Sequence, residues 1–263
     1  MRGRTSRRPT RPPGWARRPD PVRVLAVSDE VDDALLANPS AVRGVELIMA
    51  CGDLPMGYLS SLMNCLEVPL VFVPGNHDSD LSGYRTSRAG LTLRAGMPVR
   101  PPWPEGAVNA DGRVIDVAGL RVGGLGGCRR YSSGPNQYTD RQQARRALAL
   151  RARARWRRLR DGRGIDVLLA HAPPRGVGDG EDPPHRGFTA LHSLVTAVRP
   201  AALLHGHVHP YGAPARPGRV GGTMVCNVTG WHLLEIGPAT GAAELLPAAR
   251  APGARVRGRL DAR

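Results

Sequence analysis

The chain has 263 residues, a formal net charge of +15 and 41% apolar residues, so it is long enough to bury a sizeable core as one large or two small domains. All 37 basic residues are arginine. Their charge is either an electrostatic footprint for nucleic acid or the composition of a GC-rich genome, and we favour the second for the folded body. Four scattered cysteines without a CxxC pair exclude a zinc knuckle and a disulfide framework. No apolar run reaches the roughly 18 residues of a membrane helix, so we expect a cytoplasmic protein without a membrane partner.

Both ends of the chain differ in composition from the middle. Residues 1–20 are rich in arginine and proline and cannot bury apolar surface, and residues 247–263 are similar. We therefore predict a disordered basic arm and a basic tail around one domain at 21–246. The arm either contacts an acidic partner or is solvated without function.

Strands and helices alternate from residue 22 onward. Continuous apolar runs predict buried strands at 22–27, 45–50 and 70–73. Between the second and third runs, apolar residues at helical spacing predict a helix over 56–66. This order predicts parallel strands joined by crossover helices.

The middle of the chain differs from this pattern. Residues 113–117 and 120–123 predict an antiparallel pair, whereas the segment 123–131 is too polar and glycine-rich for a strand. A long helix follows, because Thr139 and Gln142 have capping-box spacing and Asp161-Gly162 stops it. Its apolar stripe, opposite a solvated arginine face, consists of Leu148, Ala152, Trp156 and Leu159.

The last third returns to buried strands. Apolar runs predict strands at 165–170, 201–204, 223–228 and 233–236, and a short helix at 191–198 is closed by proline. The pattern contains no internal repeat and no second domain.

Residues with metal-ligand chemistry lie just past the ends of the predicted strands. They are Asp29, Asp53, Asn76, His171, His207 and His209. Open α/β sheets place ligands at the carboxyl ends of their strands. Mn, Fe(II) and Zn accept this mixture of carboxylate, amide oxygen and imidazole, and a carboxylate can bridge two ions. A single histidine is more often structural than a ligand, but the set as a whole predicts a metal centre.

Two further residues suggest how such a centre acts. Two cations about 3.5–4 Å apart clamp a phosphate and lower the pKa of bound water toward ~7. His77, directly beside Asn76, is then a candidate to protonate the leaving alkoxide, with Asp78 holding its ring. The pattern predicts hydrolysis of a phosphate ester.

These segments resemble the ordered motifs of the calcineurin-like metallophosphoesterases. The resemblance covers roughly residues 22–236 and rests on Asp29, Gly52-Asp53, Gly75-Asn76-His77-Asp78, His171 and Gly206-His207-Val208-His209. It implies a four-layer αββα sandwich of two mixed sheets. It also implies that the six residues above bind the metal, with Asp53 bridging and His77 catalytic. Members of the family hydrolyse phosphomonoesters or phosphodiesters, including cyclic nucleotides and nucleic acids, so the substrate stays open.

One motif departs from the family. The first motif is usually Asp-x-His, but this chain has Asp29-Glu30-Val31, and valine cannot coordinate a metal. We expect Glu30 to point away from Asp29 because side chains alternate along a strand. Either Asp32 or Asp33, reaching the site through a turn, or extra water is expected to replace the missing imidazole. Three alternatives follow: a dinuclear enzyme with one labile ion, a mononuclear enzyme, or a degenerate binding protein.

Two loops are candidates for the substrate pocket. The glycine-rich segment 123–131, together with 134–138, resembles a segment found in a bacterial subgroup of this family. That subgroup also lacks the histidine of the first motif. In the segment 123–131, Arg130 is a candidate to neutralise phosphate and Tyr131 to stack on a base or sugar, with a surface turn as the alternative. The loop 171–188 is a candidate lid or source of outer ligands, with His185 as the preferred polar contact.

The leading hypothesis is a metal-dependent phosphoesterase acting on a small phosphate ester, with diesters slightly preferred. One alternative is a phosphate- or nucleotide-binding protein that has lost turnover through Val31. Another is a nucleic-acid phosphoesterase, which predicts steeply salt-dependent binding. The oligomeric state is left open.

Overall fold

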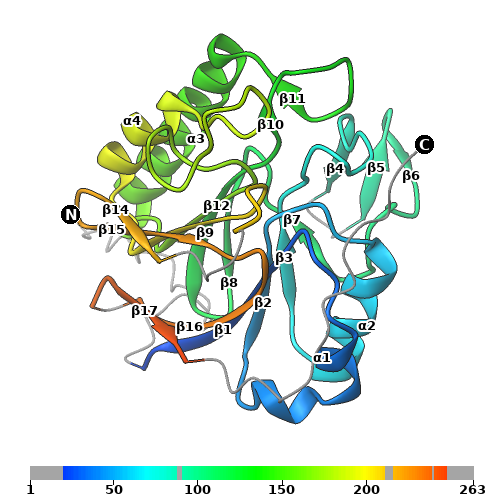
Figure 1. Cartoon of the computed structure of the whole chain (residues 1–263). Helices are drawn as coiled ribbons and strands as arrows, with labels where there is room; N and C mark the ends of the chain where they lie inside the picture. The colour runs from blue at the N-terminus through cyan, green and yellow to red at the C-terminus, as the bar shows by residue number, and fades with distance from the viewer. Residues whose placement is uncertain (1–19, 88–90, 211–215, 239, 248–263) are drawn as a thin grey trace, which may run out of the picture.

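Two mixed β-sheets form the centre of the computed structural model, which describes residues 20–87, 91–210, 216–238 and 240–247 (Figure 1). The first six-stranded sheet has the order β17-β16-β1-β2-β3-β7. Its strands are β1 (Val22–Ser28), β2 (Leu47–Ala50), β3 (Leu70–Phe72), β7 (Val108–Asn109), β16 (Gly230–Gly237) and β17 (Ala242–Leu246). Strands β1, β2, β3 and β7 are parallel, as the β-α-β order predicts, and β16 joins β1 in antiparallel register.

The second sheet also has six strands, in the order β14-β15-β13-β12-β9-β8. They are β8 (Val114–Val117), β9 (Leu120–Leu125), β12 (Val167–Ala170), β13 (Ala202–His205), β14 (Gly218–Val220) and β15 (Thr223–Asn227). The four central strands are parallel, and β8 and β14 are antiparallel edges. The predicted antiparallel pair of β8 and β9 is therefore confirmed.

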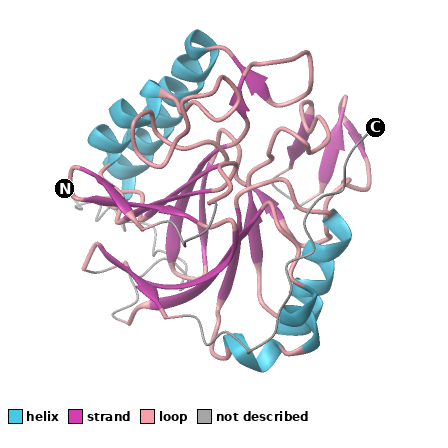
Figure 2. Cartoon of the chain, viewed as in Figure 1, coloured by secondary structure: helices cyan, strands magenta, loops and turns pink. Residues whose placement is uncertain are grey.

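Helices cover the outer faces of both sheets, on opposite sides of the strands (Figure 2). The first sheet carries α1 (Asp33–Ala37), η2 (Pro39–Val42) and α2 (Met56–Leu66), and the second carries α3 (Asp140–Asp161) and α4 (Thr189–Val198). Within the described residues, no helix combines the length and apolar character that crossing a membrane requires.

Three apolar cores separate the layers. Val24 of β1 belongs to the core between the sheets, which also contains Leu169, whereas its neighbour Leu25 belongs to the outer core, which also contains Leu59 of α2. The third core joins the second sheet to α3 and α4. Because both faces of each sheet are buried, their strands are continuously apolar rather than alternating. The layers are thus helix, sheet, sheet and helix, as the resemblance implies.

Small strands lie at the periphery of the sandwich (Figure 1). An antiparallel group comprises β4 (Tyr84–Thr86), β5 (Thr92–Arg94) and β6 (Met97–Pro98), and β10 (Cys128–Arg129) pairs in parallel with β11 (Gln137–Tyr138). The predicted basic arm and tail lie outside the described residues, apart from Asp20 and Pro247.

Helix α3 begins and ends as predicted but presents a different face to the sheet. Its capping box at Thr139 and its left-handed cap at Gly162 are both present. The predicted apolar stripe is wrong, because Leu148, Trp156 and Leu159 are 64%, 59% and 77% exposed. The buried face consists of Gln143, Ala147, Leu150 and Ala154.

Arginines explain this orientation of α3. Arg146 binds the carboxylate of Asp111, and Arg153 and Arg157 donate to the backbone carbonyls of Gly112 and Val114. Short alanines on the buried face let the helix lie close enough to the sheet for these contacts. Polar anchoring therefore sets the orientation of the helix, and the larger apolar side chains face solvent.

The glycine-rich segment also differs from its prediction. Strand β9 continues through Gly123 and Gly124 to Leu125 and is buried throughout, so the expected loop at these positions is wrong. A Cβ on Gly123 would lie 2.8 Å from Ile165 Cδ1, and one on Gly124 would lie 2.6 Å from the carbonyl oxygen of Ala110. These glycines therefore serve close packing of the strand rather than a turn.

Candidate metal centre

The carboxyl ends of strands from both sheets meet at one edge of the sandwich. The Asp29 amide, after β1, donates to the carbonyl of Gly52, after β2, over 3.2 Å. The Gly206 amide, after β13, donates to the carbonyl of His171, after β12, over 3.0 Å. The His207 amide then joins the two sheets by donating to Asp29 Oδ2 over 2.8 Å.

Three of the predicted ligands form a tight cluster at this edge. The ligand atoms of Asp53, His171 and His207 all lie within 4.8 Å of one another. His171 is fully buried, and its Nε2 lies 2.9 Å from Asn76 Oδ1 and 3.2 Å from Asp53 Oδ2. Asn76 therefore belongs to the same cluster.

Backbone carbonyls hold one nitrogen of each buried imidazole. His171 Nδ1 lies 2.7 Å from the carbonyl oxygen of Cys51, and His207 Nε2 lies 2.8 Å from that of Pro184. A carbonyl only accepts, so these nitrogens carry the hydrogen, and the lone pairs of the neutral rings are on His171 Nε2 and His207 Nδ1. Histidines that bind metals have this arrangement.

The electrostatics of the cluster fit a cation. Burial alone would lower the pKa of His171, but the carboxylates of Asp53 and Asp29 outweigh it and raise that pKa to about 9. Burial works to raise the pKa of Asp53, yet His171 holds it below its usual value. Burial and the neighbouring His171 lower the pKa of His207 to about 3. Two imidazoles, a carboxylate and an amide oxygen suit a divalent cation such as Zn, Mn or Fe(II).

The loop that carries Asn76, His77 and Asp78 is bound to the strand ends through its backbone. The His77 amide donates to Asp53 Oδ1 over 2.8 Å. Asp78 Oδ2 accepts from the amides of Gly75 and Asp53 over 2.7 and 3.0 Å. Asp78 thus fixes the backbone of two loops instead of holding the His77 ring. The imidazole of His77 is exposed, and no side chain in the described parts of the chain hydrogen-bonds it.

Glycines make this approach possible. A Cβ on Gly75 would collide with Asp53 Oδ1, and a Cβ on Gly206 would collide with Asp29 Oδ2. Both positions therefore require glycine because a ligand carboxylate occupies the space of the side chain.

The remaining predicted ligands lie on a more open side of the centre. Asp29 is half-buried there, and desolvation raises its pKa. His209 is partly exposed, and its Nδ1 lies 3.0 Å from Glu30 Oε1. Val31 is 40% exposed and offers no ligand atom.

The acids expected to replace the missing histidine lie elsewhere. Asp32 caps α1 through the Ala34 amide and accepts a hydrogen bond from Trp231 Nε1 over 2.7 Å. Asp33 is exposed in the first turn of that helix. The expectation that Glu30 points away from the site is also wrong, because Asp29 does not continue the strand: its φ of +62° turns the chain.

Two of the three predicted substrate residues reach the centre. The Asn76 amide nitrogen donates to the Tyr131 hydroxyl over 3.2 Å. The ring of His185 lies 5.2 Å from that of His207, centroid to centroid, and its Nδ1 lies 2.6 Å from Asp182. Arg130 is exposed and donates to the Gln137 carbonyl over 3.3 Å.

Sequence reasoning assigned no role to Asn136, which supports the site. Its side-chain nitrogen donates to the carbonyls of Gly75 and Asp78 over 2.9 and 3.1 Å, and its own φ is +52°. The turn sequence Gly134-Pro135-Asn136 was the available signal, because asparagine tolerates the left-handed conformation.

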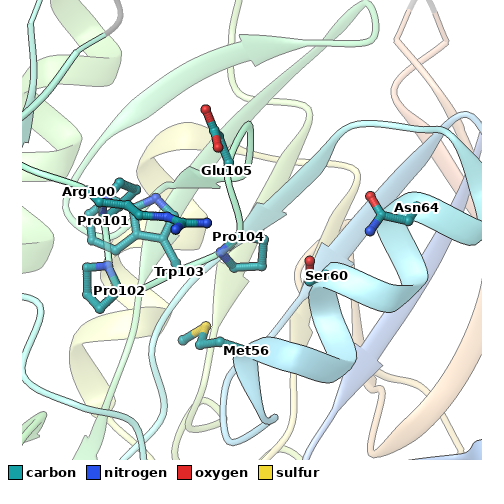
Figure 3. A pocket seen from close by; sticks show the side chains of 9 residues that line it. All are labelled: Met56, Ser60, Asn64, Arg100, Pro101, Pro102, Trp103, Pro104 and Glu105. Atoms are coloured by element: carbon teal, nitrogen blue, oxygen red, sulfur yellow. The ribbon is translucent and has the colours of Figure 1, made fainter.

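Two hollows lie near this region without forming part of the cluster. One of about 440 Å³ lies between α2 and the proline-rich segment 100–105, and its helix side chains are Met56, Ser60 and Asn64 (Figure 3). Another of about 210 Å³ lies behind the histidine loop and is lined by Pro74 and Asn136 among others. Neither is lined by Asp53, His171 or His207.

Comparison with known proteins agrees with this geometry. The family model of the calcineurin-like phosphoesterases matches residues 25–211, and the chain belongs to this family. Members of this family are in general metal-dependent phosphoesterases. The cluster of Asp53, His171 and His207 is consistent with a divalent cation. A comparison with curated proteins gives no match.

Solved structures match the chain at low identity. The protein TT1561 of Thermus thermophilus is 16% identical, with 87% of this chain and 99% of that chain covered and a TM-score of 0.53. Vps29 of Entamoeba histolytica complexed with Zn is 12% identical, with 86% and 97% covered and a TM-score of 0.39. The first likeness concerns the fold alone.

Proposed function

We propose that the chain hydrolyses a phosphate ester, with phosphodiesters preferred, at a divalent-cation centre around Asp53. The convergence of electron-pair donors carries the proposal. His171 Nε2 lies within 3.2 Å of oxygens of both Asn76 and Asp53, while its other nitrogen is held by a carbonyl. Without a cation, a proton on Nε2 joins the imidazole to these oxygens, and a divalent cation would take the place of that proton. Mn, Fe(II) and Zn are the cations that this donor set suits.

Two sets of residues would hold two cations. Asn76, His171 and His207 would hold one, Asp29 and His209 the other, and Asp53 would bridge them. A bound cation supplies charge to the phosphate and lowers the pKa of water toward ~7.

The histidine loop supplies the remaining chemistry. His77 is assigned to protonate the leaving alkoxide, because its imidazole is exposed and its backbone is tied to Asp53. Asp78 is a positioning residue, since its carboxylate holds the amides of Gly75 and Asp53 together. This backbone clamp keeps His77 beside the site where the ester bond breaks.

The preference for diesters follows from charge. A phosphomonoester carries about −1.5 to −2 near neutral pH, whereas a diester carries one negative charge. Val31 supplies no imidazole on the open side, so a cation would be held there less tightly. Less positive charge would then face the phosphate. Tyr131, which receives a hydrogen bond from Asn76, and His185, beside His207, are assigned to contact the substrate.

The test is Mn²⁺-dependent hydrolysis of bis(p-nitrophenyl) phosphate compared with p-nitrophenyl phosphate. We expect activity that requires the cation, is higher on the diester, and falls about 10²–10⁴-fold in His77→Ala. His192→Gln is the matched control, because this histidine hydrogen-bonds the Arg175 carbonyl away from the cluster. No turnover with any divalent cation in folded protein would favour the phosphate-binding alternative.

A nucleic-acid substrate is the second candidate. The observation that favours it is the exposed face of α3, which carries Arg141, Arg145, Arg151, Arg155 and Arg158. Contacts of arginines with phosphates make binding steeply dependent on salt. Affinity for DNA or RNA that does not change between low and physiological salt would contradict this candidate.

A further inference from the structure

The open side of the centre contains a paired carboxylate and imidazole. Glu30 Oε1 lies 3.0 Å from His209 Nδ1, although the two residues are far apart in the chain. The side chains are 34% and 42% exposed, so both border solvent at the edge of the cluster. The residue usually found beside them in the family, a histidine, is here Val31.

Two sharp turns bring these residues together. The Glu30 amide donates to the Ser28 carbonyl over 2.6 Å across Asp29, and the Val208 amide donates to the Gly206 carbonyl over 2.8 Å across His207. Both central residues have positive φ, +62° and +68°, which defines γ-turns of the rare, strained kind. The hydrogen bond from the His207 amide to Asp29 locks one turn to the other, and the residues that follow, Glu30 and His209, meet.

The same arrangement recurs at all three candidate histidine ligands. An oxygen holds one nitrogen of each ring: the Cys51 carbonyl for His171, the Pro184 carbonyl for His207, and Glu30 for His209. At the first two rings this contact leaves the other nitrogen as the electron-pair donor. Only the ring on the open side has a carboxylate in this place, and a carboxylate that holds one imidazole nitrogen fixes the tautomer and the orientation of the ring.

We propose that Glu30 is a positioning residue for His209, which it orients so that Nε2 is the ligand nitrogen for a second divalent cation. This inference rests on the proposed function. Because Val31 contributes no imidazole, the second site depends on His209 more than it would with a complete first motif. Glu30 strengthens that one ligand and adds negative charge beside the site. Asp32 does not hold His209, because its two carboxylate oxygens accept hydrogen bonds from the Ala34 amide of α1 and from Trp231 Nε1.

The experiment is calorimetric titration of the metal-free full chain with Mn²⁺, which gives the number and affinity of sites without reference to activity. We expect a tight site and a weaker one in the native chain. Glu30→Ala should weaken only the weaker site, by about 10–100-fold, as loss of an outer partner of a ligand does. The unchanged tight site serves as the internal control for folding, and Glu244→Gln, an exposed acid on β17, should leave both sites as they are.

Two further variants distinguish orientation from direct ligation. Glu30→Gln keeps an oxygen that can accept from Nδ1, so we expect it to restore most of the affinity that Glu30→Ala loses. In a His209→Ala background, Glu30→Ala should have no additional effect, because the residue acts through the imidazole. Additive losses would overturn the positioning role in favour of direct ligation.

The remaining outcomes separate this inference from the proposed function. Two sites with the same affinities in native protein and Glu30→Ala would overturn the role of Glu30 while leaving the centre intact. A single site in the native chain would overturn the second cation position, and with it this inference, while leaving the proposed hydrolysis at the first site. Absence of any Mn²⁺ binding in folded native protein would overturn the proposed function and this inference together.

Discussion

The two ends of strands β9 and β12 carry buried polar clusters of opposite character. At the amino ends, Arg121 is fully buried and its guanidinium binds Asp116, Asp161 and the Arg163 carbonyl. At the carboxyl ends lie the glycine-rich loop and His171. The same two parallel strands, in register with each other, thus support both clusters.

The clusters differ in whether their charges balance. The amino-end cluster contains the arginines 121, 157 and 163 and the aspartates 116, 161 and 166, all linked by hydrogen bonds or ion pairs. At the carboxyl end, carboxylate, amide and imidazole donors converge on His171, and no arginine side chain has a contact there in the part of the chain that the structure describes. A cluster with matched charges stabilises the fold, whereas a cluster of donors whose counter-charge is a displaceable proton on His171 is suited to bind a cation.

The largest expected effect is on stability, from Arg121→Met. Removing the buried guanidinium takes an ion-pair partner from Asp161 and leaves Asp116 with Arg157 alone, which costs about 3–5 kcal/mol. Urea denaturation measures the free energy of unfolding. Arg158→Met, an exposed residue of α3, is the control and should change it by less than about 0.5 kcal/mol. A loss from Arg121→Met as small as that of the control would contradict the structural role of this cluster.

The next effect concerns the opposite end of the strands. Asp53→Asn keeps an oxygen for the His77 amide but removes the charge that faces His171. Loss of a residue that only hydrogen-bonds a metal ligand typically lowers activity roughly 10–100-fold. Because Asp53→Asn changes a proposed ligand itself, we expect phosphodiester hydrolysis to fall by more than this. Cation titration measures the loss of affinity, and the hydrolysis assay measures the loss of activity. The urea midpoint of metal-free Asp53→Asn should shift much less than that of Arg121→Met.

The control for this variant is Asp33→Asn, in the exposed first turn of α1. It should bind cations and hydrolyse the diester as the native chain does. If Asp53→Asn instead unfolded the protein while retaining cation affinity, the assignment of binding to one end and stability to the other would be reversed.

A smaller effect is the pH dependence that the amino-end cluster introduces. Hydrogen bonds from Arg121 lower the pKa of Asp161 to about 2. Because this folded-state pKa lies below the value of an unfolded aspartate, near 4, the contribution is fully present above about pH 4 and is lost as pH falls toward 2. Urea midpoints of native protein and Asp161→Asn between pH 2 and 6 should converge at the acid end. Parallel curves would show that Asp161 does not contribute in this way.

The smallest effect concerns the support of the histidine loop. Asn136→Gly removes the hydrogen bonds to the Gly75 and Asp78 carbonyls without straining the left-handed backbone. We expect kcat for the diester to fall about tenfold, or about 1.4 kcal/mol, with the number of bound cations unchanged. Ser133→Gly, exposed in the same loop, is the matched control. Loss of a cation in Asn136→Gly would show that this loop builds the metal site and does more than support it.

Local sequence patterns were sufficient for much of the fold. Apolar runs located the parallel strands, the spacing of Thr139 and Gln142 located the start of α3, and antiparallel β8 and β9 were expected. The family resemblance implied the layered sandwich. The order of strand ends also placed Asp53, Asn76 and His171 at one edge, where the structure brings them together.

The network around Arg121 had no sequence signal. Its six charged members look like ordinary surface residues, and only the tertiary structure brings them together and buries Arg121, Arg163 and Asp166. The face of α3 was mispredicted for the same reason, since Arg146 and its neighbours attach the helix through backbone and carboxylate groups that periodicity does not reveal.

The sequence by itself determined which residues form strands and which ligand types follow them, because strand periodicity and residue chemistry are local properties. Only the tertiary structure decided that Glu30 meets His209 and that Asp78 clamps two backbone amides. Those contacts depend on positive φ at Asp29 and His207, and a hydrogen bond between residues 178 positions apart links the two turns. A pattern along the chain does not encode such a conformation, because the partner that stabilises it comes from the other sheet.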